Sequence, residues 1–543
     1  MPRPQRRLPI SRAMIVAPQP EAVEAGADML RAGGSAIDAV LAAAFVQGVV
    51  DPLMCGIGGL GVMQVHDPKT GEQIVLDGLS TCPAACTPDM WQAIYQGECP
   101  DGYGYILEGH VNELGQGAVT TPGILRLFAA AHAQWGRKPW ARLFDAARDI
   151  ATRGFLIRPH VAGMFAMSEK AYRRSDYREK LAFTPDGASL YLRPDGTPKK
   201  AGDIVYNPDL AHSLGLVANE GAETLYTGEL AAEIIADMKL NGGLVSAVDL
   251  EGYQVVRRAP LHVGYRGYTI AAPPPPSGGI MVAEMLRILE HFDLASLGHN
   301  SPEYIRIVAE AMKIAGRDKD IHIGDPAWMT PPIDRLLSDD YATACADGIR
   351  AGHKTSLSRA VEPTGTTTIS CVDADGLVVS LTHTLGLPSG VIVPGTGFML
   401  NGAMNWYDPR PGRAGSIAGG KRRFSSMAPS IVLQDGKPVA TLGAPGGAWI
   451  TPAILQALLN LFDWGMTMQE AVMAPRFSAT SDCIDLSNRI PFSTEAALRA
   501  MGYETTRSPM SYAFAAVHGI TMFDGVLEGG ADPQRDGYAA GIS

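Results

Sequence analysis

Residues 365–384 carry the pattern that most restricts the fold of this chain, Gly-Thr-Thr-Thr-Ile-Ser-Cys-Val-Asp-Ala-Asp-Gly-Leu-Val-Val-Ser-Leu-Thr-His-Thr. Two runs rich in β-branched residues flank an Asp-Gly pair, which is a strong short-range signal for a two-stranded hairpin. We therefore predict strands over 366–372 and 377–382, joined by a turn at Asp373–Gly376. Threonine is common in strands, so a hairpin alone would account for these residues.

Helical and strand-like patterns follow one another without regular alternation along the rest of the chain. Within 20–50 the sequence predicts a helix, a break at Gly33-Gly34, and a second helix with Ser35 as its N-cap and Asp38 in its first turn. Helical periodicity also occurs around 124–154, 228–240, 280–292, 302–316 and 451–462, and strand-like alternation at 263–270, 430–433 and 439–442. This mixture predicts helices layered on antiparallel sheets, an α/β (α+β) fold.

Charge restricts the partners of this protein. The 543-residue chain has a net charge of -11, and its 46% hydrophobic and 19% charged residues are ordinary for a soluble globular protein. An acidic surface repels nucleic acid and anionic membranes, so we expect neither as a partner. The basic residues 1–7 are not followed by the apolar segment of a secretion signal, and the longest apolar run, 39–50, is too short to cross a bilayer. These features predict a cytoplasmic protein.

The cysteines and glycines indicate no cofactor. Seven scattered cysteines without a C-x-x-C pair favour neither a disulfide framework nor a zinc site, although a single local disulfide within 55–99 is left open. The glycine-rich segment 55–61 precedes a strand-like run at Val62–His66 instead of joining a strand to a helix, so it does not predict a dinucleotide site. We expect no metal and no organic cofactor.

A chemical interpretation of the hairpin assigns a function to Thr366. A threonine hydroxyl is a poor nucleophile, but a threonine at a new chain terminus carries its own base, an α-amine with a pKa of about 7.7–8.0. Such an enzyme first cleaves its own backbone by hydroxyl attack on the preceding carbonyl. Gly365 suits this step because it adds no side-chain bulk and tolerates strain. Cleavage there would give a large subunit, 1–365, and a small subunit, 366–543.

Several motifs resemble the gamma-glutamyltranspeptidase family. Thr366–Thr384 is similar to the start of the family's small subunit, Arg423-Phe-Ser-Ser-Met-Ala-Pro429 to its paired-serine motif, and Leu442-Gly-Ala-Pro-Gly-Gly447 to its glycine pair. Further ordered matches occur at 33–39, 121–123, 241–244, 265–268, 274–279, 324–326 and 531–533. The implied fold is the four-layer αββα sandwich of N-terminal-nucleophile (Ntn) hydrolases.

The resemblance also implies the roles of individual residues. Thr366 is expected to be the nucleophile and Thr384 to hydrogen-bond to it, while Ser425 and Ser426 are expected to bind a substrate carboxylate. The backbone N–H groups of Gly446 and Gly447 are expected to form the oxyanion hole, which suits donors near a helix start. His383 points to the opposite strand face from Thr382 and Thr384, so we expect it to be a packing or surface residue and not a base.

The sequence departs from the family where the γ-glutamyl head group is bound. Leu79 occupies the position of an arginine that pairs with the α-carboxylate, and we expect Leu79 and Trp406 to contact the substrate. Ala403 and Trp406 stand where a glutamine and an aspartate hold the α-amino group, and Gly386 replaces an asparagine; Asn405 and Asp408 are alternative substrate-binding residues. Each lost charge-assisted contact is worth roughly 1.5–3 kcal/mol, which predicts poor activity on glutathione.

The expected function is therefore hydrolysis of another amide by an autoprocessing threonine amidohydrolase. The substrate is a small molecule, of which oxamate and glutaryl-type acyl amides are examples, and the short glycine-rich segment 409–420 favours an open pocket with water as acceptor. The two subunits form a heterodimer, and pairing into a heterotetramer is left open. One alternative is gamma-glutamyl transfer or glutathione hydrolysis, with Arg422 or Arg423 in place of the lost arginine. The other is an uncleaved, inactive binding protein.

Overall fold

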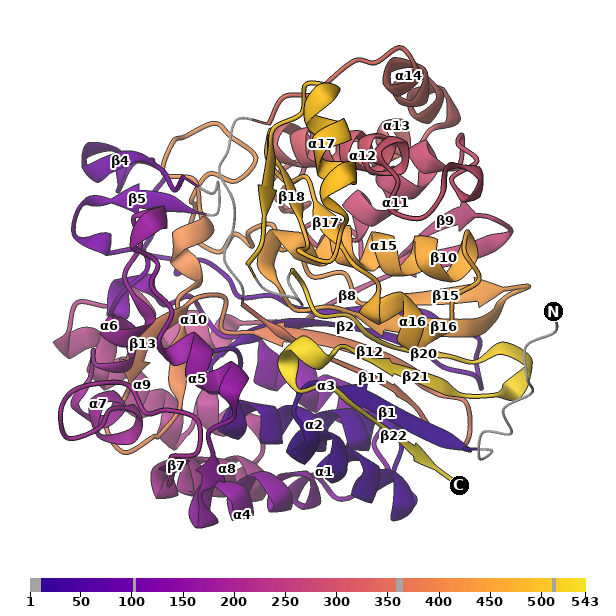
Figure 1. Cartoon of the computed structure of the whole chain (residues 1–543). Helices are drawn as coiled ribbons and strands as arrows, with labels where there is room; N and C mark the ends of the chain where they lie inside the picture. Colours follow the sequence, from indigo (N-terminus) through magenta and orange to yellow (C-terminus); the bar gives the residue numbers. More distant parts are fainter. Residues whose placement is uncertain (1–10, 101–103, 358–364, 510–513) are drawn as a thin grey trace.

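Two antiparallel sheets lie face to face between two layers of helices in the computed structural model of the chain (Figure 1). It describes residues 11–100, 104–357, 365–509 and 514–543. Most of the buried hydrophobic residues belong to three clusters, each between two of these layers. One cluster lies between the first sheet and its helices, a second between the other sheet and its helices, and a smaller one, which includes Val16, Val372, Ile431 and Ile520, between the two sheets. The expected four-layer αββα order is confirmed.

The first sheet has seven strands and contains the predicted hairpin at its centre. In order across the sheet they are β22 (Tyr538–Ile542), β1 (Ala13–Ala17), β11 (Thr367–Val372), β12 (Val378–Thr384), β2 (Leu60–His66), β3 (Gln73–Gly78) and β8 (Val256–Arg258). In this order β1, from before Gly365, lies between β22 and β11 from after it, and β12 pairs with β2 from before it. A chain cut after Gly365 would therefore keep its two parts joined by sheet hydrogen bonds.

The second sheet has six strands. Their order is β21 (Glu528–Ala531), β20 (His518–Thr521), β16 (Lys437–Gly443), β15 (Ser430–Gln434), β10 (Tyr268–Ala272) and β9 (Leu261–Tyr265). Short strands elsewhere are β4 (Tyr95–Glu98), β5 (Tyr105–Leu107), β6 (Phe155–Leu156), β7 (Ile204–Val205), β13 (Pro388–Ile392), β14 (Met399–Asn401), β17 (Phe477–Ser478), β18 (Ile484–Leu486) and β19 (Thr505–Arg507).

The helices form the two outer layers (Figure 1). The layer on the first sheet includes α1 (Pro20–Arg31), α2 (Ala36–Val50), α3 (Ile124–Trp135), α4 (Asp145–Arg153) and α8 (Pro208–Glu220), and the layer on the second includes α11 (Gly279–Leu289), α12 (Pro302–His322), α14 (Asp339–Arg350) and α15 (Ile450–Phe462). The other helices are α5 (Pro159–Phe165), α6 (Tyr177–Leu181), α7 (Pro185–Tyr191), α9 (Glu229–Leu240), α10 (Ala247–Gly252), α13 (Ile333–Leu336), α16 (Met468–Met473) and α17 (Phe492–Ala500). Among the described residues, none of these helices combines the length and apolar character needed to span a bilayer.

Local signals predicted most of these elements, with two exceptions. Ser35 caps α2 in a reciprocal capping box with Asp38, as expected. The predicted single strand 263–270 is wrong, because Arg266 and Gly267 both have positive φ and turn the chain back, so that β9 pairs with β10. The predicted helical stretch 124–154 is interrupted after α3, where Gly136 adopts an extended conformation.

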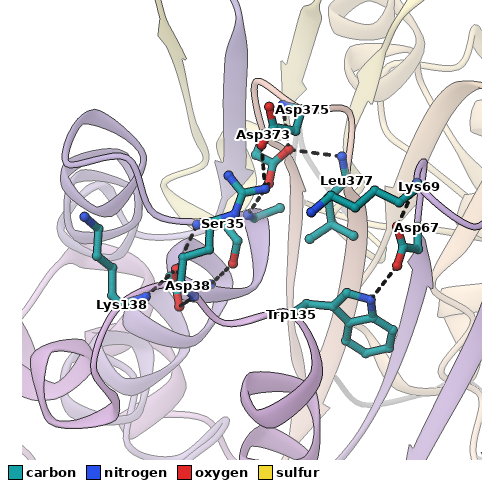
Figure 2. Close-up of polar contacts among 11 residues, drawn as sticks. Ser35, Asp38, Asp67, Lys69, Trp135, Lys138, Asp373, Asp375 and Leu377 are labelled. Atoms are coloured by element: carbon teal, nitrogen blue, oxygen red, sulfur yellow. Dashed lines mark hydrogen bonds and ion pairs between the residues drawn. The ribbon is translucent and has the colours of Figure 1, made fainter.

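A network of carboxylates fastens the hairpin turn to the helical layer (Figure 2). Asp373 accepts hydrogen bonds from the N–H groups of Ala36 at 3.1 Å and Leu377 at 3.0 Å, so it joins the start of α2 to the turn. Arg137 lies 2.6 Å from Asp375 and 3.5 Å from Asp373. These contacts hold the turn of the β11–β12 hairpin against the helical layer. The position of the other end of the hairpin, where Thr366 and Thr384 lie, is fixed as a result.

Asp485 in β18 makes the stability of the protein depend on pH. Its side chain is buried, and neither oxygen has a hydrogen-bond partner among the described residues, so burial raises its pKa from 3.8 to about 7. Between these values the native state holds a proton that the unfolded chain releases. The contribution of Asp485 to the free energy of unfolding therefore falls as the pH rises from about 4 to 7.

We predict that Asp485→Asn removes this dependence. Relative to the wild type, the free energy of unfolding is expected to rise by on the order of 3 kcal/mol between pH 4 and pH 8, since one pKa unit corresponds to about 1.4 kcal/mol. Denaturant titrations at the two pH values measure this difference, with Asp435→Asn on the exposed β15–β16 turn as the matched control. If the free energy of unfolding changed equally with pH in the two variants, the raised pKa of Asp485 would be contradicted.

Candidate active site

The open end of the β11–β12 hairpin brings two threonines together. Thr367 pairs with His383 and Thr368 with Thr382, and one more step of this register places Thr366 opposite Thr384. Thr366 is buried and has a φ of 85°, a conformation that is costly for a β-branched residue. Such strain persists only where the surroundings impose it, and it is common at functional sites.

The strained segment at Gly365 and Thr366 is held by Arg535 and lies close to Gly386. Arg535 Nη1 donates to the carbonyl oxygen of Thr366 at 2.5 Å. Thr384 Oγ1 accepts a hydrogen bond from the N–H of Gly386 at 2.8 Å. A Cβ added to Gly365 would lie 3.1 Å from the carbonyl oxygen of Gly386, closer than most side chains tolerate. The Gly365–Thr366 bond thus lies in a confined place that favours glycine before the threonine.

The serine pair lies in the segment just before β15. Ser425 donates its N–H to the carbonyl oxygen of Pro276 at 2.8 Å, and its Oγ accepts from the N–H of Met427 at 3.4 Å. The proline run 273–276 begins where β10 ends, as its missing N–H groups predict. Ser425 is buried and Ser426 is half-buried. The proline run, distant in sequence, thus holds Ser425 through the backbone of Pro276.

The glycine pair lies between β16 and α15. Gly446 has a φ of 136° and Gly447 a φ of 60°, and a 3-10 turn over Gly447–Trp449 leads into α15. A Cβ added to Gly446 would lie 2.6 Å from that of Ala515, so only glycine fits there. Backbone N–H groups just before a helix favour negative charge, as an oxyanion hole requires.

These parts meet in one cleft of about 540 Å³, although only Gly447 of the glycine pair lines it and Gly446 does not. Its lining includes six residues that were predicted for the site or its substrate contacts: Thr366, Thr384, Trp406, Ser425, Ser426 and Gly447. Asp408, proposed as an alternative substrate contact, also lines it, as do Arg410, Arg413 and Gly415 of the segment 409–420. This volume suits a small molecule.

Leu79 and Asn405 were predicted to contact the substrate, but neither lines this cleft. Leu79 is fully buried in the apolar cluster against the second helical layer. The Asn405 side-chain oxygen accepts hydrogen bonds from Asn112 at 2.9 Å and from the N–H of Tyr105 at 3.3 Å. Asn405 therefore supports the start of β5, where Tyr105 itself lines the cleft.

Three of the departures from the family pattern turn out to lie side by side. A Cβ added to Gly386 would lie 2.6 Å from the Trp406 ring and 3.4 Å from the Ala403 Cβ. The indole thus occupies the space that a side chain at position 386 would need. Glycine at 386 therefore makes room for tryptophan at 406, and the Ala403 side chain lies beside the same position.

His383 is a packing residue, as predicted. Its Nε2 lies 2.8 Å from the side-chain oxygen of Gln47, and its ring contacts Phe128 on α3. Complete burial lowers its pKa to about 3, so it is neutral at neutral pH. Thr382 and Thr368 lie on the other strand face, with their hydroxyl oxygens 3.2 Å apart. His383 therefore has neither the direction nor the contacts of a base for Thr366.

Sequence reasoning missed the buried charges behind Thr366. Arg535 is buried, and burial lowers the pKa of its guanidinium. The carboxylate of Asp51, at the end of α2, opposes this shift more than any other charge. Burial raises the pKa of Asp51 to about 7, although Arg535 and a hydrogen bond from Gln19 oppose the rise. The Ala531-Asp-Pro533 match lay next to Arg535, but nothing local indicated that this arginine reaches Thr366.

Known proteins are similar to this chain over nearly its whole length. A model of the Gamma-glutamyltranspeptidase family matches residues 22–542. The chain is 38% identical to the acylase ACY 1 proenzyme of Pseudomonas sp. (strain V22), over 98% of this chain and 94% of the relative. It is 32% identical to the glutathione hydrolase proenzyme of Bacillus subtilis (strain 168), over 98% and 91%. Its structure is similar to that of a cephalosporin acylase from Bacillus halodurans, with a TM-score of 0.87, 27% identity and coverage of 99% and 98%.

Proposed function

This chain belongs to the gamma-glutamyltranspeptidase family, and we propose that it is a self-cleaving amidohydrolase with Thr366 as its nucleophile. The observation that carries the proposal is the convergence of Thr366, Thr384, the serine pair and Gly447 on one cleft. The similarity to acylase and glutathione hydrolase proenzymes supports it. Self-cleavage after Gly365 would give subunits 1–365 and 366–543, with Thr366 at a free terminus.

The free N-terminus of Thr366 would supply the base for the reaction. The α-amine of Thr366 accepts the proton of its own hydroxyl, and Oγ1 attacks the carbonyl carbon of the substrate amide. The N–H groups of Gly446 and Gly447 hold the oxyanion, and the amine leaves with the proton from the Thr366 ammonium. Water, deprotonated by the same amine, then attacks the ester and releases the acid. Thr384 orients Thr366 throughout.

The acyl group of the substrate lacks a γ-glutamyl head group in this proposal. A site for that group needs polar side chains for an α-amine and an α-carboxylate. Here the Trp406 ring and the Ala403 side chain both lie next to Gly386, and Leu79 is buried away from the cleft. An apolar ring that desolvates charged groups without pairing them disfavours a γ-glutamyl substrate. Acylase-type hydrolysis is therefore favoured over glutathione hydrolysis.

The subunits are proposed to stay together as a heterodimer. In the seven-stranded sheet, β1 pairs with β22 and β11 and β2 pairs with β12 across the cleavage point, and β10 pairs with β15 in the other sheet. Separation would break hydrogen-bonded pairs within both sheets. Pairing into a heterotetramer and a cytoplasmic location stay predictions.

Initial rates on chromogenic anilides test the proposal. Purified protein is expected to hydrolyse at least one simple acyl p-nitroanilide with a kcat/KM at least about 10-fold above that for γ-glutamyl p-nitroanilide, because one lost charge-assisted contact costs this much. An added dipeptide acceptor is expected to leave the rate unchanged. The reverse preference, with stimulation by the dipeptide, would support gamma-glutamyl transfer instead.

A further inference from the structure

A buried arginine lies directly behind the proposed nucleophile. Arg535 is 3% exposed, and its Nη1 donates to the carbonyl oxygen of Thr366 at 2.5 Å. Because this oxygen and the Thr366 nitrogen belong to one residue, the guanidinium also lies within about 6 Å of that nitrogen. Arg535 is not among the described residues that line the cleft, so we do not expect it to pair with a bound substrate.

The segment that carries Arg535 is fixed by buried polar contacts. Arg476 and Asp532 form an ion pair in which both side chains are almost fully buried. Asp532 also accepts the N–H of Gln534 at 3.1 Å, and the Gln534 side chain donates to the carbonyl oxygen of Phe514 at 2.7 Å. Arg535 follows directly, so a firmly held backbone sets the direction of its side chain.

The charge of Arg535 is not neutralised by a contacting carboxylate. Arg476 is paired with Asp532, whereas Arg535 takes part in none of the ion pairs found among the described residues. Asp51, at the end of α2, is the carboxylate that acts on it most strongly. A guanidinium stays protonated in proteins, so a positive charge remains next to Thr366.

The titratable groups that act on the buried guanidinium come from several elements. They are Asp51 and Cys55 after α2, His160 of α5, Tyr177 of α6, His518 of β20 and Asp532 of the same segment. Desolvation lowers the pKa of His160 to about 3 and that of His518 to about 4, and it raises the pKa of the Cys55 thiol, so these three groups are neutral at pH 7. The Asp532 carboxylate is already paired, which leaves Asp51 as the group whose charge opposes the guanidinium.

A positive charge in this place acts on the α-amine that self-cleavage would release at Thr366. A free α-amine has a pKa of about 7.7–8.0, so at pH 7 most of it is protonated and cannot accept the hydroxyl proton. A like charge within about 6 Å disfavours the protonated form, and the effect is large where water is excluded. Arg535 therefore favours the neutral amine, which is the form that the proposed mechanism needs.

We propose that Arg535 is a positioning residue with two effects on Thr366: its hydrogen bond holds the carbonyl group of the nucleophile, and its charge keeps the released α-amine neutral and able to act as a base at neutral pH. This inference rests on the proposed self-cleaving amidohydrolase. It adds a residue that lies outside the cleft and acts on the base instead of the substrate. The carboxylate of Asp51 weakens the effect because it opposes the charge of Arg535.

The pH dependence of kcat/KM for an anilide substrate tests this inference in the wild type. The acidic limb of the profile reports the base of the free enzyme. We expect an apparent pKa near 7, below the range of about 7.7–8.0 of an unperturbed α-amine. A value within or above that range would overturn the inference, and this comparison needs no variant.

Two variants change the charge behind Thr366 in opposite directions. Arg535→Gln removes the positive charge, so we expect the acidic limb to move up by roughly one pH unit and the ratio of the rates at pH 7 and pH 9 to fall about fivefold. Asp51→Asn removes the opposing carboxylate, so we expect the limb to move to lower pH. Structural damage alone would lower the rate at every pH without moving the limb in opposite directions.

Two further variants complete the series. Arg535→Lys keeps a positive charge but not the planar fork, and its acidic limb is expected to lie between those of the wild type and Arg535→Gln. Arg31→Gln removes a charge whose side chain is 56% exposed on α1, where water screens it, and is expected to leave the limb in place. Self-cleavage into 1–365 and 366–543 serves as the folding check for each variant.

The outcomes distinguish this inference from the proposed function. If Arg535→Gln were cleaved and active with the wild-type acidic limb, or if Asp51→Asn raised or abolished the limb, Arg535 would not act on the base, and the amidohydrolase would stand. If the wild type were neither cleaved after Gly365 nor active on any anilide, the proposed function itself would fail. If Arg535→Gln is not cleaved, the profiles of the wild type and Asp51→Asn decide the question.

Discussion

Thr366→Ala is expected to leave the 57.5 kDa chain uncut and without amidase activity. The change removes the hydroxyl that attacks the Gly365 carbonyl, so the α-amine that serves as the base is never released. We expect a loss of at least about 10⁴-fold in kcat, the scale seen when a nucleophile is removed. Denaturing gels and anilide hydrolysis measure the two consequences.

Thr366→Ser is the matched control for this prediction. It keeps the hydroxyl but loses a methyl group that packs in a buried position. We expect slower cleavage and reduced, measurable activity. An uncut, inactive Thr366→Ser chain would mean that the hydroxyl alone is insufficient, whereas an active Thr366→Ala chain would place the nucleophile elsewhere.

Gly446→Ala is expected to lower kcat by about 10²- to 10³-fold, the cost of losing one oxyanion donor. The φ of 136° at Gly446 is unfavourable for any residue with a Cβ, and the added methyl would lie 2.6 Å from the Ala515 Cβ. The backbone must shift to relieve this contact, which moves the N–H groups that hold the oxyanion. Steady-state kinetics with an anilide substrate give kcat.

Gly436→Ala separates the oxyanion effect from the general cost of alanine at positive φ. Gly436 lies in the β15–β16 turn with a φ of 76°, and no atom lies within 4 Å of a Cβ added there. We expect a loss of stability of about 1 kcal/mol and an unchanged kcat. If Gly446→Ala kept the wild-type kcat, the glycine pair would have no catalytic function.

The parts of the site that could be predicted are those with local signals. An Asp-Gly turn between β-branched runs specifies a hairpin, and the two-residue period then places Thr382 and Thr384 on one face. The direction of His383 followed from the same period. The glycine pair and the serine pair were found because their motifs are compact in sequence.

What could not be predicted depends on contacts between distant segments. Arg535 reaches the Thr366 carbonyl across a separation of 169 residues, and no local pattern signals this contact. The packing of Trp406 on Gly386 likewise needs the fold, because the sequence shows only that both positions differ from the family. The place of Asn405 in a motif predicted a substrate contact, but its side-chain oxygen instead accepts hydrogen bonds from Asn112 and from the N–H of Tyr105.

The central claim, that this chain cuts itself to uncover Thr366, is tested most directly by the intact mass of the freshly purified wild type. We predict two polypeptides with the masses of residues 1–365 and 366–543, the second beginning with Thr366, and no uncut chain after prolonged incubation. A single species of 57.5 kDa that persists for days would contradict the claim and leave an uncleaved binding protein as the better description.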